Sequence, residues 1–212
     1  MLRVEAGQKF ELSDNRAVYL AEVESLRKDL VSFAILEQLD TPVPAVRTTL
    51  FASLIKFDRF EWMLEKATEL GVERVVPVEA ERSERGLAEA AGKRRSRWKR
   101  IMREASEQSR RAHLPEVGSL LSIATALESA ADFRLALEEE TAPPILTALP
   151  ARRKPEDRVA LLIGPEGGWT DRERQAVAQA GWTAVSLGCH ILRAETAGIA
   201  GLAILNAAWA AP

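Results

Sequence analysis

The stretch LLIGPEGGWTDRE, residues 161–173, decides the fold because it joins three elements in a short space. Its first residues continue an apolar run from Val159 to Ile163, which predicts a buried strand. A glycine-rich turn follows, and Thr170-Asp171-Arg172-Glu173 has the spacing of a capping box that opens a helix. Ligands of parallel α/β sheets bind beyond the carboxyl ends of strands, where glycines allow close approach to the backbone. The stretch therefore indicates a small-molecule site, although a strand-to-helix turn can also be glycine-rich for structural reasons alone.

The glycine spacing excludes two common phosphate-binding motifs. It does not match GxGxxG, and no Gly-Lys-Ser/Thr follows, so neither a dinucleotide fingerprint nor a P-loop is supported.

A second strand end, LGCHILRAETA at residues 187–197, precedes an almost wholly apolar helix. It could be a hydrophobic anchor, a cysteine-histidine site, or a pocket wall formed with the first turn if the two strands are neighbours. The apolar tract is shorter than the ~20 residues of a membrane span and contains Asn206, which favours a buried helix. Adjacent residues in extended chain point to opposite sides, so Cys189 and His190 do not converge as nucleophile and base. With His113 they lack zinc-site spacing, and no metal is expected.

Three further residues near the second turn are candidates for chemistry. Arg193 is either solvated or a fixed cation that faces an anion. Glu195 and Thr196 fall in the first helical turn, where they either compensate the helix dipole and cap the helix or act in the site. The helix that follows contains small residues that would allow close approach of another backbone, at a tight helix packing or a subunit contact. These are Gly198, Ala200, Gly201 and Ala203.

Length and composition favour one large domain, or one domain plus a small one. The chain has 212 residues, 47% of them hydrophobic and 28% charged. A single cysteine excludes an internal disulfide framework and suits a reducing compartment. The first 14 residues lack the unbroken apolar stretch of a signal peptide, so a cytoplasmic protein is expected.

The pattern changes near residue 43. Residues 1–41 alternate apolar and polar positions in short runs, which predicts a small β module, and Thr41-Pro42-Val43-Pro44 suits a linker. Strands then alternate with helices, which predicts a mostly parallel sheet covered by helices. The expected strands are 46–55, 72–78, 133–137, 159–163 and 184–187. The expected helices are 58–71, opened by a capping box at Asp58 and Glu61, then 87–112, 122–130, 170–181 and 195–209, with a flexible loop at 141–156.

The predicted helix 87–112 carries a concentration of positive charge. Residues 93–111 hold nine Lys or Arg against two Glu, a net charge of +7 in a chain of net charge -2. Arg95, Lys99 and Arg103 are each four residues apart and form one stripe. A charged stripe is usually a solvated face, but the near absence of acids favours contacts with the phosphates of a polyanion.

The two turns and the basic helix together resemble the ribosomal RNA small subunit methyltransferase E family, of the SPOUT superfamily of knotted methyltransferases. The similarity rests on Lys56 with LEKATELGVERVVPVEAERS (64–83), WKRIMREASEQSRRAHLPEV (98–117), LLIGPEGGWTDRE and LGCHILRAETA. The resemblance implies an α/β domain with a trefoil knot at residues 44–212, working as a homodimer. It also implies S-adenosylmethionine as the methyl donor and N3 of a uridine in 16S ribosomal RNA of the small subunit as the acceptor.

The resemblance also assigns roles to residues. The cofactor would lie against Leu137, Ile163, the GPEGG turn (Gly164, Pro165, Glu166, Gly167 and Gly168), Leu187, Gly188, Ile191, Leu192 and Thr196. Glu195 or Glu166 would accept the N3 proton, and Arg193 would stabilise the uracil anion. RNA would contact Arg95, Lys99, Arg103, Arg110 and Arg111. A non-catalytic RNA-binding assembly factor and a ribose 2'-O-methyltransferase are the alternatives.

The chain departs from the family pattern at three points. The β module, residues 1–43, resembles a PUA-like RNA-binding barrel but is expected to be shortened before Met1-Leu2-Arg3. His190 stands where the family commonly has arginine, and His113 lies near a position that is often basic. These differences bear on RNA affinity, whereas the GPEGG turn is unchanged.

Overall fold

The computed structural model describes residues 4–42 and 44–211. The chain divides into two compact units, one of residues 1–43 together with 110–114, the other of residues 44–109 and 115–212. The predicted boundary residue, Val43, and the start at Met1-Leu2-Arg3 lie outside the described residues.

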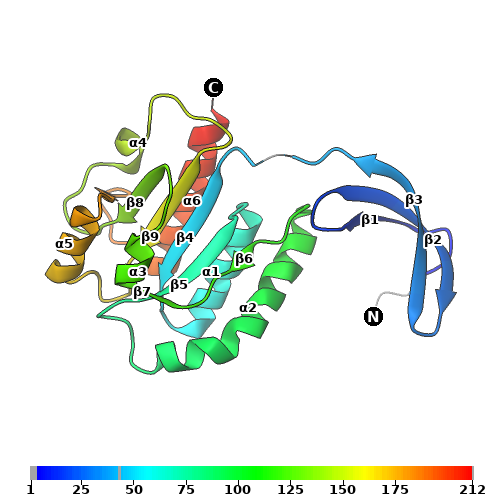
Figure 1. The fold of residues 1–212 in the computed structure, drawn as a ribbon, viewed down its shortest axis with the longest axis horizontal. Coiled ribbons are helices and arrows are strands. Elements are labelled where there is room, and N and C mark those ends of the chain that lie inside the picture. The colour runs from blue at the N-terminus through cyan, green and yellow to red at the C-terminus, as the bar shows by residue number, and fades with distance from the viewer. Residues whose placement is uncertain (1–3, 43, 212) are drawn as a thin grey trace. The chain divides into compact units, whose positions relative to one another are not determined.

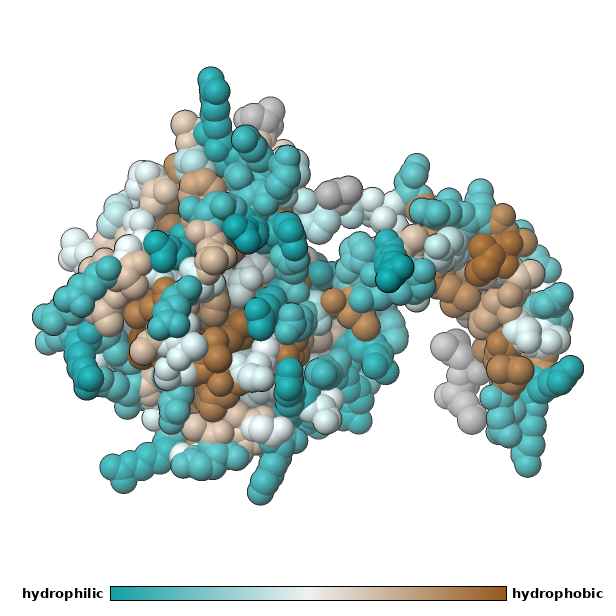
Figure 2. All heavy atoms as spheres, viewed as in Figure 1, coloured by the Kyte–Doolittle hydropathy of each residue, from teal (hydrophilic) through white to brown (hydrophobic). Residues whose placement is uncertain are grey.

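The first unit contains a three-stranded antiparallel sheet in the order β1-β2-β3. Its strands are β1 (Lys9–Ser13), β2 (Val18–Arg27) and β3 (Leu30–Leu39). Asp14 closes the turn between β1 and β2, because its carboxylate accepts hydrogen bonds from the backbone N–H groups of Arg16 and Ala17 at 2.8 and 2.9 Å. The alternating apolar runs of residues 1–41 thus form strands, as expected for a small β module. Figure 2 shows apolar side chains on the surface of this unit. Its exposed large hydrophobic residues are Leu26, Leu30, Val31, Ile35 and Leu36.

The second unit is built on a parallel sheet in the order β10-β8-β9-β4-β5-β6, with β7 also paired to β5 (Figure 1). Its strands are β4 (Arg47–Ser53), β5 (Arg74–Glu79), β6 (Glu116–Val117), β7 (Leu121–Ser122), β8 (Phe133–Leu137), β9 (Arg158–Ile163) and β10 (Thr183–Val185). The central strands are buried on both faces, which explains why their sequences are continuously apolar.

Helices cover both faces of this sheet. They are α1 (Phe57–Glu69), α2 (Leu87–Gln108), α3 (Ile123–Leu127), α4 (Ile145–Ala148), α5 (Asp171–Gln179) and α6 (Ala194–Ala210). Alternate residues of a strand point to opposite faces of the sheet and therefore belong to two different hydrophobic cores. Leu161 and Ile163 of β9 join the core with α1, α2 and α6, whereas Leu162 between them joins the core with α3 and α5. The predicted loop 141–156 is partly ordered, because α4 lies within it.

Two helix ends differ from the sequence prediction. The N-cap of helix α1 is Lys56, two residues before the expected Asp58, which lies inside the first turn instead of capping it. Glu61, the expected partner in the capping box, is buried and pairs with Arg94 and Arg97 of α2 at 3.3 and 2.8 Å. Helix α2 ends at Gln108 instead of residue 112, and Arg110 then takes a positive φ of 54°.

The segment that follows α2 belongs to the first unit. The hydroxyl of Ser13 donates to the carbonyl of Ala112 at 2.5 Å, and the backbone N–H of Leu114 donates to the side chain of Asn15 at 2.6 Å. A ring nitrogen of His113 lies 2.8 Å from the carbonyl oxygen of Asn15. These contacts hold residues 110–114 against the β1-β2 turn.

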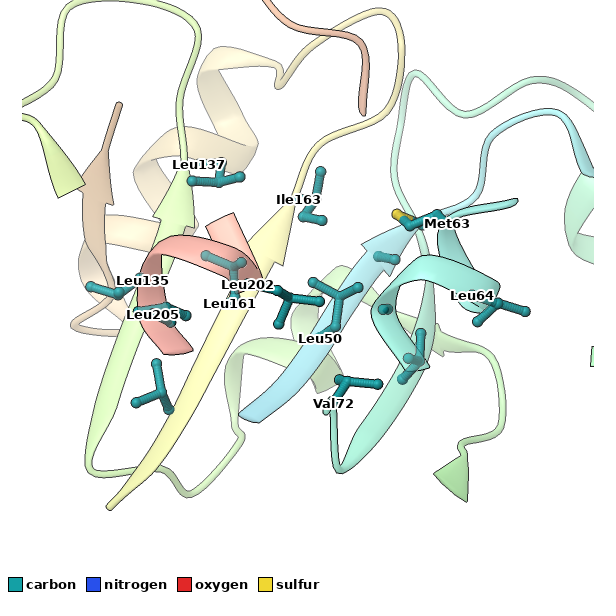
Figure 3. Close-up of a cluster of buried hydrophobic side chains, with 14 of the residues drawn as sticks. Leu50, Met63, Leu64, Val72, Leu135, Leu137, Leu161, Ile163, Leu202 and Leu205 are labelled. Atoms are coloured by element: carbon teal, nitrogen blue, oxygen red, sulfur yellow. The ribbon is translucent and has the colours of Figure 1, made fainter. Parts of the chain in front are cut away.

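Helix α6 packs directly on the sheet because glycines face it. A Cβ on Gly198 would lie 2.6 Å from Cδ1 of Ile163, and one on Gly201 would lie 2.8 Å from Cδ2 of Leu161. Figure 3 shows Leu202 and Leu205 of α6 beside Leu161. These glycines therefore serve tight packing within the chain. Within residues 4–42 and 44–211, the structure contains no helix long and apolar enough to cross a membrane.

Candidate active site

Three chain segments meet at the carboxyl edge of the sheet. The GPEGG turn (164–168) follows β9, residues 187–193 follow β10, and residues 137–139 follow β8. Strand β8 lies between β9 and β10, so the strands of the two predicted turns are not neighbours. The turns nevertheless line one cavity of about 300 Å³, because the end of β8 bridges them.

The GPEGG turn is shaped by its glycines and by Trp169. Gly168 has a φ of +68°, and its backbone N–H donates to the carbonyl of Pro165 at 2.9 Å. The indole N–H of Trp169 donates to the carbonyl of Leu137 at 3.0 Å, which ties the turn to the end of β8. A Cβ on Gly164 would lie 3.1 Å from this indole ring, so glycine allows the ring to pack against the backbone.

Most of the predicted pocket residues line this cavity. They are Leu137, Ile163, Gly164, Pro165, Glu166, Gly168, Leu187, Gly188, Ile191, Leu192 and Arg193. Cys189 and His190 also line it, although neither was among the predicted cofactor-binding residues. Their exposed side chains are parts of the wall beside the second turn.

Three predicted residues do not line the cavity. The α-carbon of Gly167 faces Arg82, whose Cβ would lie 3.2 Å from a Cβ placed on the glycine. Glu195 lies in the first turn of α6 with its side chain directed into the interior, and Thr196, one residue further around the helix, is exposed. A step of one residue rotates a helical side chain by ~100°, which separates these two neighbours.

Arg59, in the first turn of α1, was missed by the sequence analysis. It lines the cavity and forms an ion pair with Glu166 of the GPEGG turn. Its Nε also lies 4.0 Å from Oε1 of Glu195. Arg59 comes four residues after the end of the predicted buried strand 46–55, a signal that could have identified it, because the carboxyl ends of parallel strands meet at one edge.

Glu195 is a deeply buried acid at this edge, with 4% of its surface exposed. Among the described residues, its second carboxylate oxygen has no hydrogen-bond partner. A buried carboxylate is costly without compensation, so the nearby Arg59 is its main source of stabilisation. Arg59 thus lies between the buried carboxylate of Glu195 and the half-exposed carboxylate of Glu166.

Arg193 is the exposed cation of the cavity. It is the N-cap residue of α6, and its carbonyl accepts from the backbone N–H of Ala197 at 2.8 Å. Within the described parts of the chain, its guanidinium forms no hydrogen bond or ion pair. Arg193 is therefore available to an anionic group in the cavity.

Acidic residues at the end of β8 also face the cavity. Glu138 and Glu139 line it, and Arg174 of α5 pairs with Glu138 at 2.9 Å. The hydrogen bond with Glu138 raises the pKa of Arg174 above its usual value, so this guanidinium stays charged. No group of three or more potential metal ligands occurs among residues 4–42 and 44–211.

The structure separates the predicted RNA-binding residues into different environments. Lys99 and Arg103 are exposed on α2 and, within the described residues, have no hydrogen bond or ion pair. Arg95 donates to the carbonyl of Val117 at 3.1 Å, so it also holds α2 to β6. Arg110 and Arg111 lie beyond the end of α2 and belong to the first unit. Burial lowers the pKa of Arg111.

Comparisons with known proteins identify relatives along nearly the whole chain. A family model described as an RNA methyltransferase domain matches residues 42–206. The ribosomal RNA small subunit methyltransferase E of Synechocystis sp. is 33% identical, over 98% of this chain and 68% of that protein. The protein of the same name from Bacillus subtilis is also 33% identical, over 87% of this chain and 75% of its own length.

Solved structures agree with these matches. The ribosomal RNA small subunit methyltransferase E of Neisseria gonorrhoeae, bound to S-adenosyl methionine, has a TM-score of 0.87 at 32% identity, covering 98% of this chain and 86% of that one. A putative methyltransferase from Legionella pneumophila, in complex with the same cofactor, has a TM-score of 0.86 at 29% identity, covering 97% and 85%. These structures confirm the predicted α/β fold with its parallel sheet and N-terminal β module.

Proposed function

We propose, from the premise that the chain belongs to the ribosomal RNA small subunit methyltransferase E family, that it transfers a methyl group from S-adenosylmethionine to small-subunit ribosomal RNA. The acceptor atom in this proposal is N3 of a uridine in 16S RNA. The observation that supports it most is the cavity formed by the ends of β8, β9 and β10, which is lined by the two specific motifs of the family resemblance.

The residues of the cavity fit such a cofactor. A volume of about 300 Å³ is within the range of small-ligand sites. Leu137, Ile163 and Leu187 supply an apolar wall, and the glycines of the GPEGG turn expose backbone groups. When bound, the cofactor supplies an electrophilic methyl group, so the protein mainly binds, orients and excludes water.

The chain must also remove the proton from N3 of uracil. The N3 proton would move to a carboxylate of the chain, which would free the nitrogen lone pair to accept the methyl group that a bound cofactor would supply. Glu166 lines the cavity and is the proton acceptor in this proposal. Glu195, the other candidate acceptor, is buried and does not line the cavity, and its Oε1 lies 4.0 Å from Nε of Arg59. Arg193 stabilises the negative charge of the uracil ring.

RNA would approach along α2. Lys99 and Arg103 supply phosphate contacts, because their charges are free, and Arg95 adds charge to the same stripe. Residues 1–43 form the RNA-binding module of the proposal, and residues 44–212 the catalytic domain with its trefoil knot. The expected location is the cytoplasm, with the small ribosomal subunit as the partner.

We include a homodimer in the proposal because α6 has an uncovered face of small apolar residues. Ala203, Ala207 and Ala210 are exposed on α6, three or four residues apart, while other residues of the helix are buried. Trp62 on α1, the helix packed beside α6, is 47% exposed. Such a face is unusual for a monomer and suits close packing against a second copy.

A methylation assay tests the catalytic proposal. Small-subunit particles lacking the modification would be incubated with the protein and labelled S-adenosylmethionine, and the product nucleoside would be identified by nuclease digestion and mass analysis. We expect 3-methyluridine. A 2'-O-methylated nucleoside would favour a ribose methyltransferase, whereas RNA binding without label would favour a non-catalytic assembly factor.

Sedimentation tests the dimer. Ala203→Asp with Ala207→Asp places charge on the uncovered face and should give monomers. Ala178→Asp, on an exposed position of α5, is the matched control and should sediment as the unchanged protein does. A wild-type chain that sediments as a monomer at micromolar concentration would contradict the proposal.

A further inference from the structure

We propose that Arg82, outside the cavity, is a positioning residue for the GPEGG turn and thereby sets cofactor affinity. This inference rests on the proposed function, because it takes S-adenosylmethionine as the ligand of the cavity. Arg82 lies in the connection between β5 and α2 and does not line the cavity. Its effect would therefore pass through the backbone of the turn.

The guanidinium of Arg82 holds two carbonyl groups of the turn. Its Nη1 donates to the carbonyl of Gly167 at 2.9 Å and to that of Trp169 at 3.2 Å. These two carbonyls flank Gly168, the residue with a φ of +68° that lines the cavity. A cation that bridges them favours the left-handed conformation of Gly168 over the alternatives open to glycine.

Arg82 is itself presented by a fixed loop. The backbone N–H of Ser83 donates to the carbonyl of Ala80 at 3.0 Å, which closes a turn around Arg82. The backbone N–H of Glu81 donates to Glu173 at 2.8 Å. Glu173 is 2% exposed and also accepts from the backbone N–H of Thr170 at 2.9 Å, in the capping box of α5. The loop is thus attached to the helix that the GPEGG turn enters.

The position of Arg82 explains why residue 167 is glycine. A Cβ at this position would lie 3.2 Å from Cβ of Arg82, close enough that the arginine must shift. Gly167 has no positive φ, so alanine is compatible with its backbone. Because Gly167 does not line the cavity, Gly167→Ala would affect the cofactor by displacing Arg82 rather than by filling the site.

Calorimetry with S-adenosylmethionine and with S-adenosylhomocysteine tests the inference on the full chain. Arg82→Ala should raise the Kd of both probes by about threefold to tenfold, as expected for lost charge-assisted hydrogen bonds. Arg82→Lys, which keeps a charged donor, should give an intermediate Kd. Gly167→Ala should also raise the Kd, and the Kd of the double variant should be no higher than that of Arg82→Ala.

The matched control is Arg172→Ala. It removes a cation 3.6 Å from Glu81, which lies in the same loop as Arg82, and should leave the Kd unchanged.

Hydrogen exchange separates this inference from the proposed function. The amide of Gly168 should exchange faster in Arg82→Ala than in the wild type without any ligand, while amides of the central strands should not change. If the wild type bound neither probe, the proposed function and the cofactor claim would both fail, and the exchange rate would decide the positioning claim alone. A Kd for Arg82→Ala within twofold of wild type, with unchanged exchange at Gly168, would overturn the inference.

Discussion

Arg59 on α1 forms an ion pair with Glu166 of the GPEGG turn. Helix α1 lies far from this turn in the sequence, yet it fixes the side chain of Glu166. The same guanidinium lies 4.0 Å from the buried Glu195. One cation therefore connects the turn after β9 to the first turn of α6. Both carboxylates are thus held near a single guanidinium.

Removing Arg59 should destabilise the protein. Arg59→Ala leaves the buried carboxylate of Glu195 without a nearby cation, which costs about 1–3 kcal/mol in the free energy of unfolding. Urea denaturation followed by circular dichroism would measure it. Arg47→Ala breaks the exposed ion pair with Glu73 and should cost at most about 1 kcal/mol. Equal losses in the two variants would mean that Arg59 does not stabilise Glu195. The double variant Arg59→Ala, Glu195→Gln should recover part of the stability, because the uncompensated charge is gone.

Arg193→Ala should abolish most turnover while it leaves folding unchanged. Its exposed guanidinium forms no hydrogen bond or ion pair within the described residues, so stability should change by less than about 0.5 kcal/mol. If it stabilises a uracil anion, kcat should fall by about 10²–10³. Methyl transfer at saturating cofactor and RNA measures kcat, and thermal unfolding provides the folding control. Unchanged kcat would assign Arg193 to solvent.

Charge reversal on α2 should weaken RNA binding in a salt-dependent way. Lys99→Glu with Arg103→Glu should lower the affinity for small-subunit RNA and reduce the slope of log K against log salt by about 1 for each lost phosphate contact. Filter binding over a salt series would measure the slope. Arg152→Glu with Lys154→Glu, at two exposed positions of the loop before β9, is the control of equal charge change. An unaltered slope in the α2 variant would contradict phosphate contacts there. Arg95 is a poorer choice, because its reversal also removes a hydrogen bond to Val117.

Two glycine substitutions should have opposite effects on stability. Gly198→Ala forces a methyl group within 2.6 Å of Ile163 and should destabilise by about 1–3 kcal/mol through overpacking. Gly92→Ala lies on an exposed position of α2 with no atom within 4 Å of the new Cβ, and should stabilise by about 0.5–1 kcal/mol through helix propensity. Chemical denaturation of both variants tests the pair. A neutral Gly198→Ala would show that α6 can move away from β9.

The sequence predicted the helices and strands well because most of them depend on local signals. The capping box of α5 appears as predicted, since Thr170 and Glu173 need only each other and the backbone between them. The predicted box at Asp58 and Glu61 was wrong for the opposite reason. Glu61 is drawn into ion pairs with Arg94 and Arg97 from a helix about 30 residues away, and no local pattern reveals that competition.

The structure brings the predicted pocket residues to one cavity where the prediction depended on the backbone, and less so where it depended on long-range side-chain contacts. The GPEGG and LGCHILR segments were identified as pocket walls because glycines and strand ends can be recognised from the sequence alone. Gly167 and Glu195 were placed in the wall as well, yet the structure directs one toward Arg82 and the other toward Arg59. Neither arginine was singled out, since each acts from a different helix or loop.

The sequence by itself determined the alternation of strands and helices, the two glycine-rich turns and the positive charge of α2, because these follow from residue periodicity, turn chemistry and composition. Only the tertiary structure decided that β8 lies between β9 and β10 and that Arg59 holds Glu166 and Glu195. It also decided that Arg82 donates hydrogen bonds to the carbonyls of Gly167 and Trp169, on either side of Gly168. Such contacts join residues tens of positions apart. Their partners are chosen by the packing of whole elements on the sheet, which no local stretch of sequence encodes.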